Sequence, residues 1–336
     1  MGDKDTITKN YTRDNRIFAD IVNLALYGGR HVVKPENVTE LDTAELQMFF
    51  SAEPVKRRPE AVQKYRDVLK KVTMENETFV TRIIVGVENQ SSTHYAMPVR
   101  GMLYDALNYA NQVATLTKAH KENAEKLTPA EFLSGLKKED RLIPVKTIAV
   151  SYDVDAWDGP LTLHEMLNWD GIPDSVKEMV ADYSITLIQP CDLDDELLSE
   201  LQSSFGNTMG FIKYSRDAEK LGDFISKNEE QFRHFPSDAL AVVDAFCRLD
   251  FLDMEEYEEE GDCDMCKALQ DIREIERSEG RAEGITQGQV SVLGSLVLSG
   301  MISLEDALTV SGLTEEEFIN QATQLNIMIN LDSREK

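Results

Sequence analysis

The sequence of 336 residues has no long apolar run, since no segment approaches the roughly 18 uninterrupted apolar residues of a membrane-spanning helix. The first 16 residues are charged and lack the apolar stretch that a secretion signal requires. We therefore expect a soluble, cytoplasmic protein without a membrane partner.

Cysteine is also scarce. Cys191, Cys247, Cys263 and Cys266 are too few and too scattered for a disulfide framework, which favours a reducing compartment. Cys263 and Cys266 have the spacing of zinc ligands, but no second Cys or His pair lies nearby in the sequence, so a zinc site would need a dimer that shares the ion. Glycine-rich phosphate loops and nucleophile elbows are absent as well.

The sequence is rich in acid, but the acid is unevenly distributed. A net charge of −26 argues against a nucleic-acid partner, because binding to polyphosphate depends on Lys and Arg. Residues 1–150 nevertheless hold 22 basic against 20 acidic side chains, whereas the remainder holds 13 against 41. The whole acidic excess therefore lies in the second part of the chain.

A basic segment lies within the first part, between residues 56 and 71. Its basic residues, set against only Glu60 and Asp67, are Lys56, Arg57, Arg58, Lys64, Arg66, Lys70 and Lys71. Such a run fits contacts to a DNA backbone, and it also fits the solvated face of an amphipathic element.

Hydrophobic periodicity predicts an α/β protein. The expected helices cover residues 14–27, ended by Gly28 and Gly29, and 97–120; the expected strands cover 65–74, 79–87, 145–152 and 183–190. The strand at 79–87 is nearly all apolar, which is typical of a central strand covered on both faces. This succession predicts a mixed central sheet flanked by helices.

The pattern is helical throughout from Leu193 onward, so we expect a domain over residues 1–190 and an acidic, all-helical region over 191–336. Gly280, Gly284 and Gly288 recur every four residues on one helix face. They fit either a seam where helices pair, which would make the protein a homo-oligomer through these helices, or a weak linker helix.

Polar residues end the apolar run "FVTRIIVGVENQ". Side chains alternate along a strand, so Glu88 and Gln90 share one face while Asn89 points to the other. Asp67 lies in the preceding expected strand, and a short reversal between the strands would bring it beside Glu88. A divalent cation would remove the cost of burying two carboxylates, which is several kcal/mol per ion as an order of magnitude.

Ordinary salt bridges are the alternative for these two acids, with Lys70, Arg66 or Arg82 as partners. The metal site gains support because Asp67 lies inside the basic segment. A phosphodiester substrate needs cations along its backbone and acidic metal ligands at the bond that is cut.

The stretch "YRDVLKKVTMENETFVTRIIVGVENQSS", followed by "MPVRGMLYDA", resembles the core of the Rpn family of recombination-promoting nucleases. This family, also described as transposases, belongs to the PD-(D/E)XK nuclease superfamily. The residues that carry the resemblance are Asp67, Glu88, Gln90, Ser91, Arg100 and Tyr104. The phrases "WDGPLTLHEML" and "SGLTEEEF" extend it over most of the chain.

The resemblance implies a DNA endonuclease that depends on Mg²⁺ or on another divalent cation such as Ca²⁺ or Mn²⁺. It implies that Asp67 and Glu88 hold the cation, with the main-chain carbonyl of Asn89 as a third ligand. Gln90 is the third catalytic position, and there the wider superfamily has Lys. A neutral amide orients water but cannot offset negative charge, so Arg100 or Lys70 would have to supply a cation.

Two further roles follow from the same resemblance. Arg100 and Tyr104, four positions apart on a helix, would support the site. Asp20 corresponds to an additional helix acid of related nucleases, and Asp14 competes for that role.

Two other functions also fit the sequence. The chain could be an inactive interaction module that keeps a nuclease fold and assembles through its acidic helical tail. A DNA-mimicking acidic protein is the third hypothesis, and the near-neutral first 150 residues argue against it.

Overall fold

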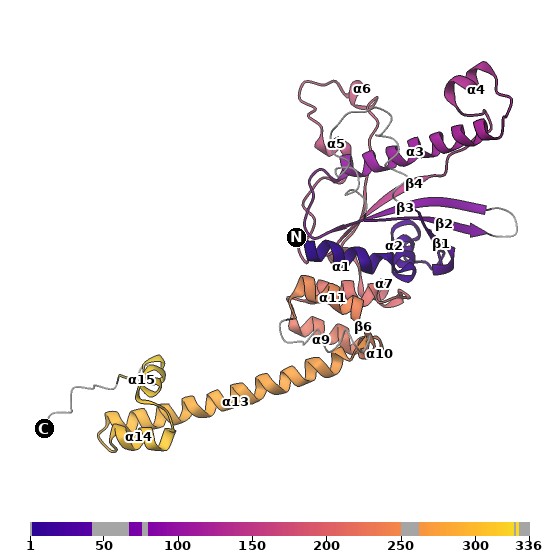
Figure 1. The fold of residues 1–336 in the computed structure, drawn as a ribbon. Helices are drawn as coiled ribbons and strands as arrows, with labels where there is room; N and C mark the ends of the chain where they lie inside the picture. Colours follow the sequence, from indigo (N-terminus) through magenta and orange to yellow (C-terminus); the bar gives the residue numbers. More distant parts are fainter. Residues whose placement is uncertain (1, 42–66, 76–79, 250–261, 326, 329–336) are drawn as a thin grey trace, which may run out of the picture. The chain divides into compact units, whose positions relative to one another are not determined.

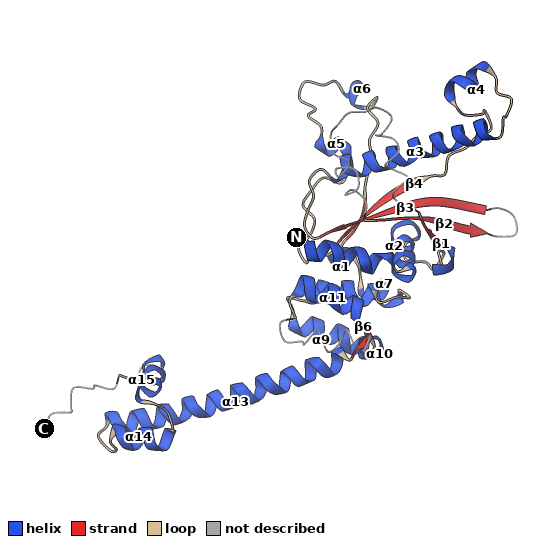
Figure 2. Ribbon diagram, viewed as in Figure 1, coloured by secondary structure: helices blue, strands red, loops and turns tan. Residues whose placement is uncertain are grey.

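The computed structural model describes residues 2–41, 67–75, 80–249, 262–325 and 327–328 (Figure 1). The chain forms two compact units, Met1–Met265 and Cys266–Lys336. Strands occur only in the first unit among the described residues, and the second is helical (Figure 2). Within the described part of the chain, every helix is too short or too polar to cross a lipid bilayer.

A five-stranded sheet in the order β1-β2-β3-β4-β5 forms the centre of the first unit. The strands are β1 (Val38–Glu40), β2 (Val68–Glu75), β3 (Val80–Gln90), β4 (Val145–Ser151) and β5 (Thr186–Ile188). β1, β2 and β3 are antiparallel neighbours, whereas β3, β4 and β5 run parallel. The sheet is therefore mixed, as predicted, and the apolar strand β3 lies at its middle.

Helices cover both faces of this sheet (Figure 1). One face packs against α3 (Met97–Glu122), and the other packs against α1 (Gly2–Arg13) and α2 (Asn15–Tyr27). The predicted helix at 14–27 is confirmed, because Asp14 caps the start of α2 and Gly28 ends it with a φ of 61°. Sequence analysis did not predict α1, whose few apolar residues give a weak periodic signal.

More helices pack behind α1 and α2. They are α7 (Asp195–Glu200), α8 (Phe205–Tyr214), α9 (Ala218–Lys227), α10 (Glu229–Arg233) and α11 (Ser237–Cys247). α11 contacts α1, and α8 contacts α2, so they bury their apolar faces against the first part of the chain. The domain boundary expected at residue 190 therefore does not coincide with the observed division at Met265.

The remaining elements of the first unit are short. They are η1 (Pro35–Asn37), α4 (Pro129–Ser134), α5 (Leu163–Met166), α6 (Asp174–Lys177), η4 (Pro190–Asp192), β6 (Phe235–Pro236) and β7 (Asp262–Cys263). β6 and β7 pair with each other, so the region after residue 190 is not all-helical as expected.

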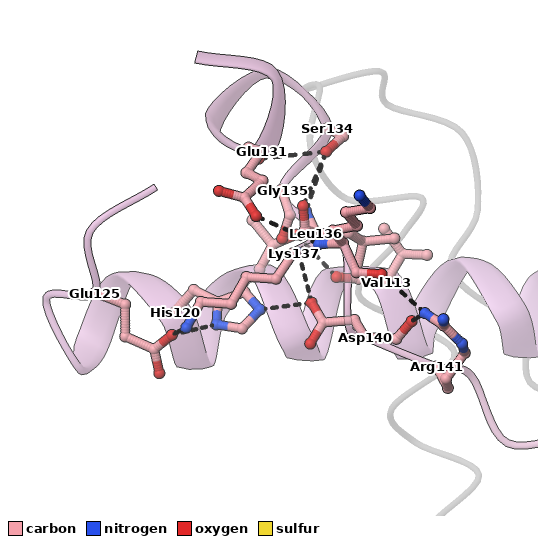
Figure 3. A network of polar contacts seen from close by, with 12 residues as sticks. Val113, His120, Glu125, Glu131, Ser134, Gly135, Leu136, Lys137, Asp140 and Arg141 are labelled. Carbon is pink, nitrogen blue, oxygen red and sulfur yellow. Dashed lines mark hydrogen bonds and ion pairs between the residues drawn. The ribbon is translucent and has the colours of Figure 1, made fainter. Parts of the chain in front are cut away.

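A polar network fastens the far end of α3 to the loop around α4 (Figure 3). The His120 ring contacts Glu125 Oε2 through Nδ1 at 3.0 Å and Asp140 Oδ2 through Nε2 at 2.8 Å. Its hydrogen bond to Asp140 raises the pKa of His120, which favours the imidazolium that both contacts require. Lys137 pairs with Glu125 and completes the network.

The second unit consists of α13 (Met265–Leu298), α14 (Leu304–Ser311) and α15 (Glu315–Gln324). A capping box begins each of the last two helices: Ser303 pairs with Asp306 at the start of α14, and Thr314 pairs with Glu317 at the start of α15. A small core joins the three helices, formed by Val290, Ala307, Phe318 and Ala322.

The hydroxyl of Tyr11 fixes α1 to the helices behind it, and this contact can be tested by mutation. Tyr11 is 1% exposed, and its hydroxyl lies 3.0 Å from both Ser204 Oγ and Thr208 Oγ1. Tyr11→Phe should lower the free energy of unfolding by about 1–2 kcal/mol in urea denaturation, because it leaves buried hydroxyls without a partner. Tyr95→Phe is the control, since the exposed Tyr95 hydroxyl bonds only to Asp158 among described residues. Equal effects of the two substitutions would contradict this account.

Candidate active site

The ladder between β2 and β3 brings Asp67 and Glu88 to the same end of two neighbouring strands. Val68 pairs with Val87, so one further step in the same register sets Asp67 opposite Glu88. Instead of continuing the ladder through its main chain, Asp67 accepts a hydrogen bond from the Asn89 amide at Oδ2, at 2.8 Å. The expected reversal between these strands therefore does bring the two acids into adjoining positions.

The side chains at the end of β3 alternate between the two faces of the sheet, as predicted. Glu88 lies on the α3 face, where Arg100 Nη2 is 2.9 Å from Glu88 Oε2. Asn89 lies on the α1 face, where its Nδ2 donates to Thr12 Oγ1 at 3.0 Å. Gln90 is 8% exposed, and its carbonyl accepts a hydrogen bond from the Tyr152 amide.

Arg100 forms an ion pair with Glu88. The Glu88 side chain is fully buried, whereas that of Arg100 is 26% exposed. Arg100 Nε also donates to the Tyr104 hydroxyl at 2.8 Å, so the two helix residues named by the resemblance are in contact. Burial opposes the charge of Arg100, but the attraction of Glu88, Tyr104 and Asp67 outweighs burial and raises the pKa of the guanidinium.

Asp67 is held in a partly desolvated position. Burial raises the pKa of Asp67, and the hydrogen bond from Asn89 and the positive charges of Lys9 and Arg100 only partly offset the burial. Asp67 is thus an acid whose ionised form carries a cost that a nearby cation would lower.

Three residues that sequence analysis missed lie around Asp67. Lys9 and Asp5 come from α1, and their charges lower and raise the pKa of Asp67, respectively. Tyr152 follows β4, and burial, together with the charge of Asp67, raises the pKa of its hydroxyl. The Tyr152 hydroxyl is fully buried and makes no hydrogen bond with a described residue. One feature of the sequence points to the residues from α1. The spacing of Asp5, Lys9 and Thr12 places their side chains along one face of a helix.

Asp20 does not join this group. It is 2% exposed in α2, and its Oδ2 accepts hydrogen bonds from Ser203 N at 2.8 Å and from Ser203 Oγ at 2.5 Å. Asp20 therefore fixes the segment that leads into α8. Asp14 is engaged as the cap of α2 and pairs with Arg16. The expectation of a helix acid from α2 is thus not supported by the contacts of either residue.

Lys70 is the clearest correction among the expected DNA contacts. It is 1% exposed, and its Nζ donates to the Arg13 carbonyl and, at 2.6 Å, to Asn15 Oδ1. Burial lowers the pKa of this ammonium. Lys70 therefore joins β2 to the start of α2 and cannot contact DNA from this position.

The other basic residues of the segment divide into two groups. Lys71 is partly exposed on the α3 face and lines a cavity of about 320 Å³ together with Arg141. Five residues lie outside the described part of the chain, namely Lys56, Arg57, Arg58, Lys64 and Arg66.

The described residues contain no group of three or more His, Cys, Asp or Glu side chains that could hold a metal ion, Cys263 and Cys266 included. The oxygen atoms that a metal ion could bind at the end of β3 are therefore those of two carboxylates and of the main chain. Both main-chain groups of a strand residue face the same neighbouring strand, so the Asn89 carbonyl is directed to the side of Asp67, like the Asn89 amide.

Comparisons of the chain with protein-family models, with curated proteins and with solved structures gave no match.

The pKa directions of Asp67 and Asp14 predict opposite effects of two similar substitutions in buffer with EDTA. The folded-state pKa of Asp67 is raised, so its ionised form weakens the fold at neutral pH. Asp67→Asn should therefore raise the melting temperature at pH 7, and the gain should vanish below about pH 4, where the carboxyl is protonated in both states.

Asp14→Asn is the matched control, because the hydrogen bond from Arg16 lowers the pKa of Asp14. This substitution should lower the melting temperature at pH 7, and the loss should shrink as the pH falls through the folded-state pKa. Melting curves at several pH values check both. A loss of stability in Asp67→Asn at pH 7 would contradict the assignment.

The Glu88–Arg100 pair generates a further prediction. Arg100→Met removes the guanidinium from a fully buried carboxylate and should lower the free energy of unfolding by about 3 kcal/mol. Adding Glu88→Gln in the same chain should restore most of this loss, because no buried charge then remains. A double-mutant cycle by urea denaturation measures the coupling, and additive effects would show that the two charges do not interact.

Proposed function

We propose that the chain is a divalent-metal-dependent DNA endonuclease of the PD-(D/E)XK type, as the resemblance to the Rpn family implies. The observation that carries the proposal is the position of Asp67 and Glu88 at one end of β2 and β3, joined through the Asn89 amide. Two acids so placed, one fully buried and one with a raised pKa, carry a desolvation cost that a bound cation would offset.

The residues at this end of the sheet fit Mg²⁺, Mn²⁺ or Ca²⁺. These are hard cations that take oxygen ligands, and Mg²⁺ commonly binds through one or two carboxylates and keeps several waters. Asp67, Glu88 and the Asn89 carbonyl supply that donor set. When bound, such a cation polarises a phosphate oxygen and lowers the pKa of a coordinated water.

The protein's own groups would orient the substrate and the water. Gln90 is a neutral amide at the end of β3, suited to hold a water by hydrogen bonds. The partly exposed Arg100 can face a phosphate on one side while its Nη2 stays near Glu88. DNA contacts would come from Lys71 and from the five basic residues outside the described part of the chain, whereas Lys70 is excluded by its burial.

A second function is favoured by one observation, the ion pair between Glu88 and Arg100. Since the guanidinium already neutralises Glu88, the fold would tolerate a site that binds no metal. The chain would then be an inactive nuclease-fold module that assembles through its helical tail. Exposed apolar side chains on the second unit support an assembly between copies of the chain: Ile285, Val292, Met301 and Val310.

A cleavage assay distinguishes the two functions. Purified protein should nick or linearise plasmid DNA in the presence of Mg²⁺ or Mn²⁺ and should be inactive in EDTA. Asp67→Asn and Glu88→Gln should each lower the rate by at least about a hundredfold, since each removes an electrostatic element of the site. Glu122→Gln, which changes an exposed carboxylate at the end of α3, should cleave like the wild type.

Cleavage that survives both site substitutions would point to a contaminant or to a different site. A wild-type protein that does not cleave with any of the three cations would favour the interaction module.

A further inference from the structure

Among the residues that the structure describes, the basic side chains named so far at the end of β3 are engaged with other protein groups. Gln90 is neutral, Lys70 is buried with its ammonium bonded to Arg13 and Asn15, and Arg100 pairs with Glu88. Phosphodiester cleavage builds up negative charge on oxygen, and a preorganised positive group stabilises that charge.

The helix α1 brings another cation to this place. Its Thr12 is fully buried and accepts a hydrogen bond from Asn89, the residue whose amide binds Asp67. Lys9 precedes Thr12 by three positions, so both side chains lie on the same face of α1, one turn apart. Because Thr12 contacts Asn89, Lys9 lies on the face of α1 that packs against the end of β3.

The buried Tyr11 hydroxyl anchors α1 in this position. It lies 3.0 Å from both Ser204 Oγ and Thr208 Oγ1. Lys9 is only partly buried, and its ammonium forms no ion pair or hydrogen bond with the residues that the structure describes.

We propose that Lys9 contacts the substrate phosphate beside Asp67 and supplies the positive charge that Gln90 does not. This inference rests on the proposed nuclease function and adds a residue to that site. In the reaction, a water oxygen forms a bond to phosphorus and gives up its proton to solvent. The bond from phosphorus to the leaving oxygen breaks, and that oxygen takes up a proton from solvent. The Lys9 ammonium stabilises the negative charge without transferring a proton. Lys9 thus acts from α1, on the face of the sheet opposite Arg100.

Three variants of the full chain test this role. Lys9→Met should lower kcat on plasmid DNA about a hundredfold, with a smaller change in KM. Lys9→Arg keeps the charge and should stay within about tenfold of the wild type. Lys4→Met, on the same helix but against Phe246, should cleave like the wild type. Circular dichroism melts identify any variant that is not folded.

A binding measurement that does not depend on cleavage accompanies the kinetics. In EDTA, the logarithm of the affinity for duplex DNA falls with the logarithm of the salt concentration, and the slope reports the number of phosphate contacts. Lys9→Met should reduce this slope by about 0.9, whereas Lys4→Met should leave it unchanged.

The outcomes separate the two proposals. If the wild type cleaves and Lys9→Met has an unchanged kcat and an unchanged salt slope, the role of Lys9 is overturned while the nuclease function stands. If the wild type does not cleave DNA with any of the three divalent cations, the nuclease function fails, and the catalytic role of Lys9 fails with it.

Discussion

The hydrogen bond from the Asn89 amide to Asp67 Oδ2 is the contact on which the candidate site depends. At Val68 the regular ladder of β2 ends, and the carboxylate of Asp67 takes the place of the next main-chain acceptor for β3. This exchange keeps Asp67 against the end of β3, where Glu88 and Gln90 emerge on one face and Asn89 on the other. The antiparallel register therefore determines which side chains meet.

Burial of charge is the second constraint. Glu88 is fully buried beside Arg100, and the burial of Asp67 raises its pKa. The ionised form of each carboxylate has a higher free energy in this position than it would have in water. Neither carboxylate is needed for the core of the sheet, which is made by residues such as Val85, Val87 and Ile148. Departures of this kind from the most stable arrangement are typical of functional sites. Arg100 limits the cost for Glu88, and a divalent cation would limit it for both acids.

Much of this arrangement could be predicted from the sequence, because strands and long helices have strong periodic patterns. The central position of β3, the mixed sheet and the alternation at Glu88 and Asn89 all followed from local rules. Contacts between residues far apart in the sequence could not be predicted from such local rules. Lys70 has the sequence context of a surface cation in a basic segment, yet it is buried and donates hydrogen bonds to Arg13 and Asn15. Asp20 accepts a hydrogen bond from Ser203, which is 183 positions away in the sequence. The helix α1 was not predicted because it is polar and weakly periodic, and Lys9 was therefore not expected near the site.

Binding of Mn²⁺ followed by electron paramagnetic resonance tests the central claim most directly, since it reports the cation independently of DNA and of activity. The account predicts one saturable site in the wild type, lost in Asp67→Asn and in Glu88→Gln and retained in Glu122→Gln. Binding that is unchanged in the first two variants, or that is absent from the wild type, would contradict it.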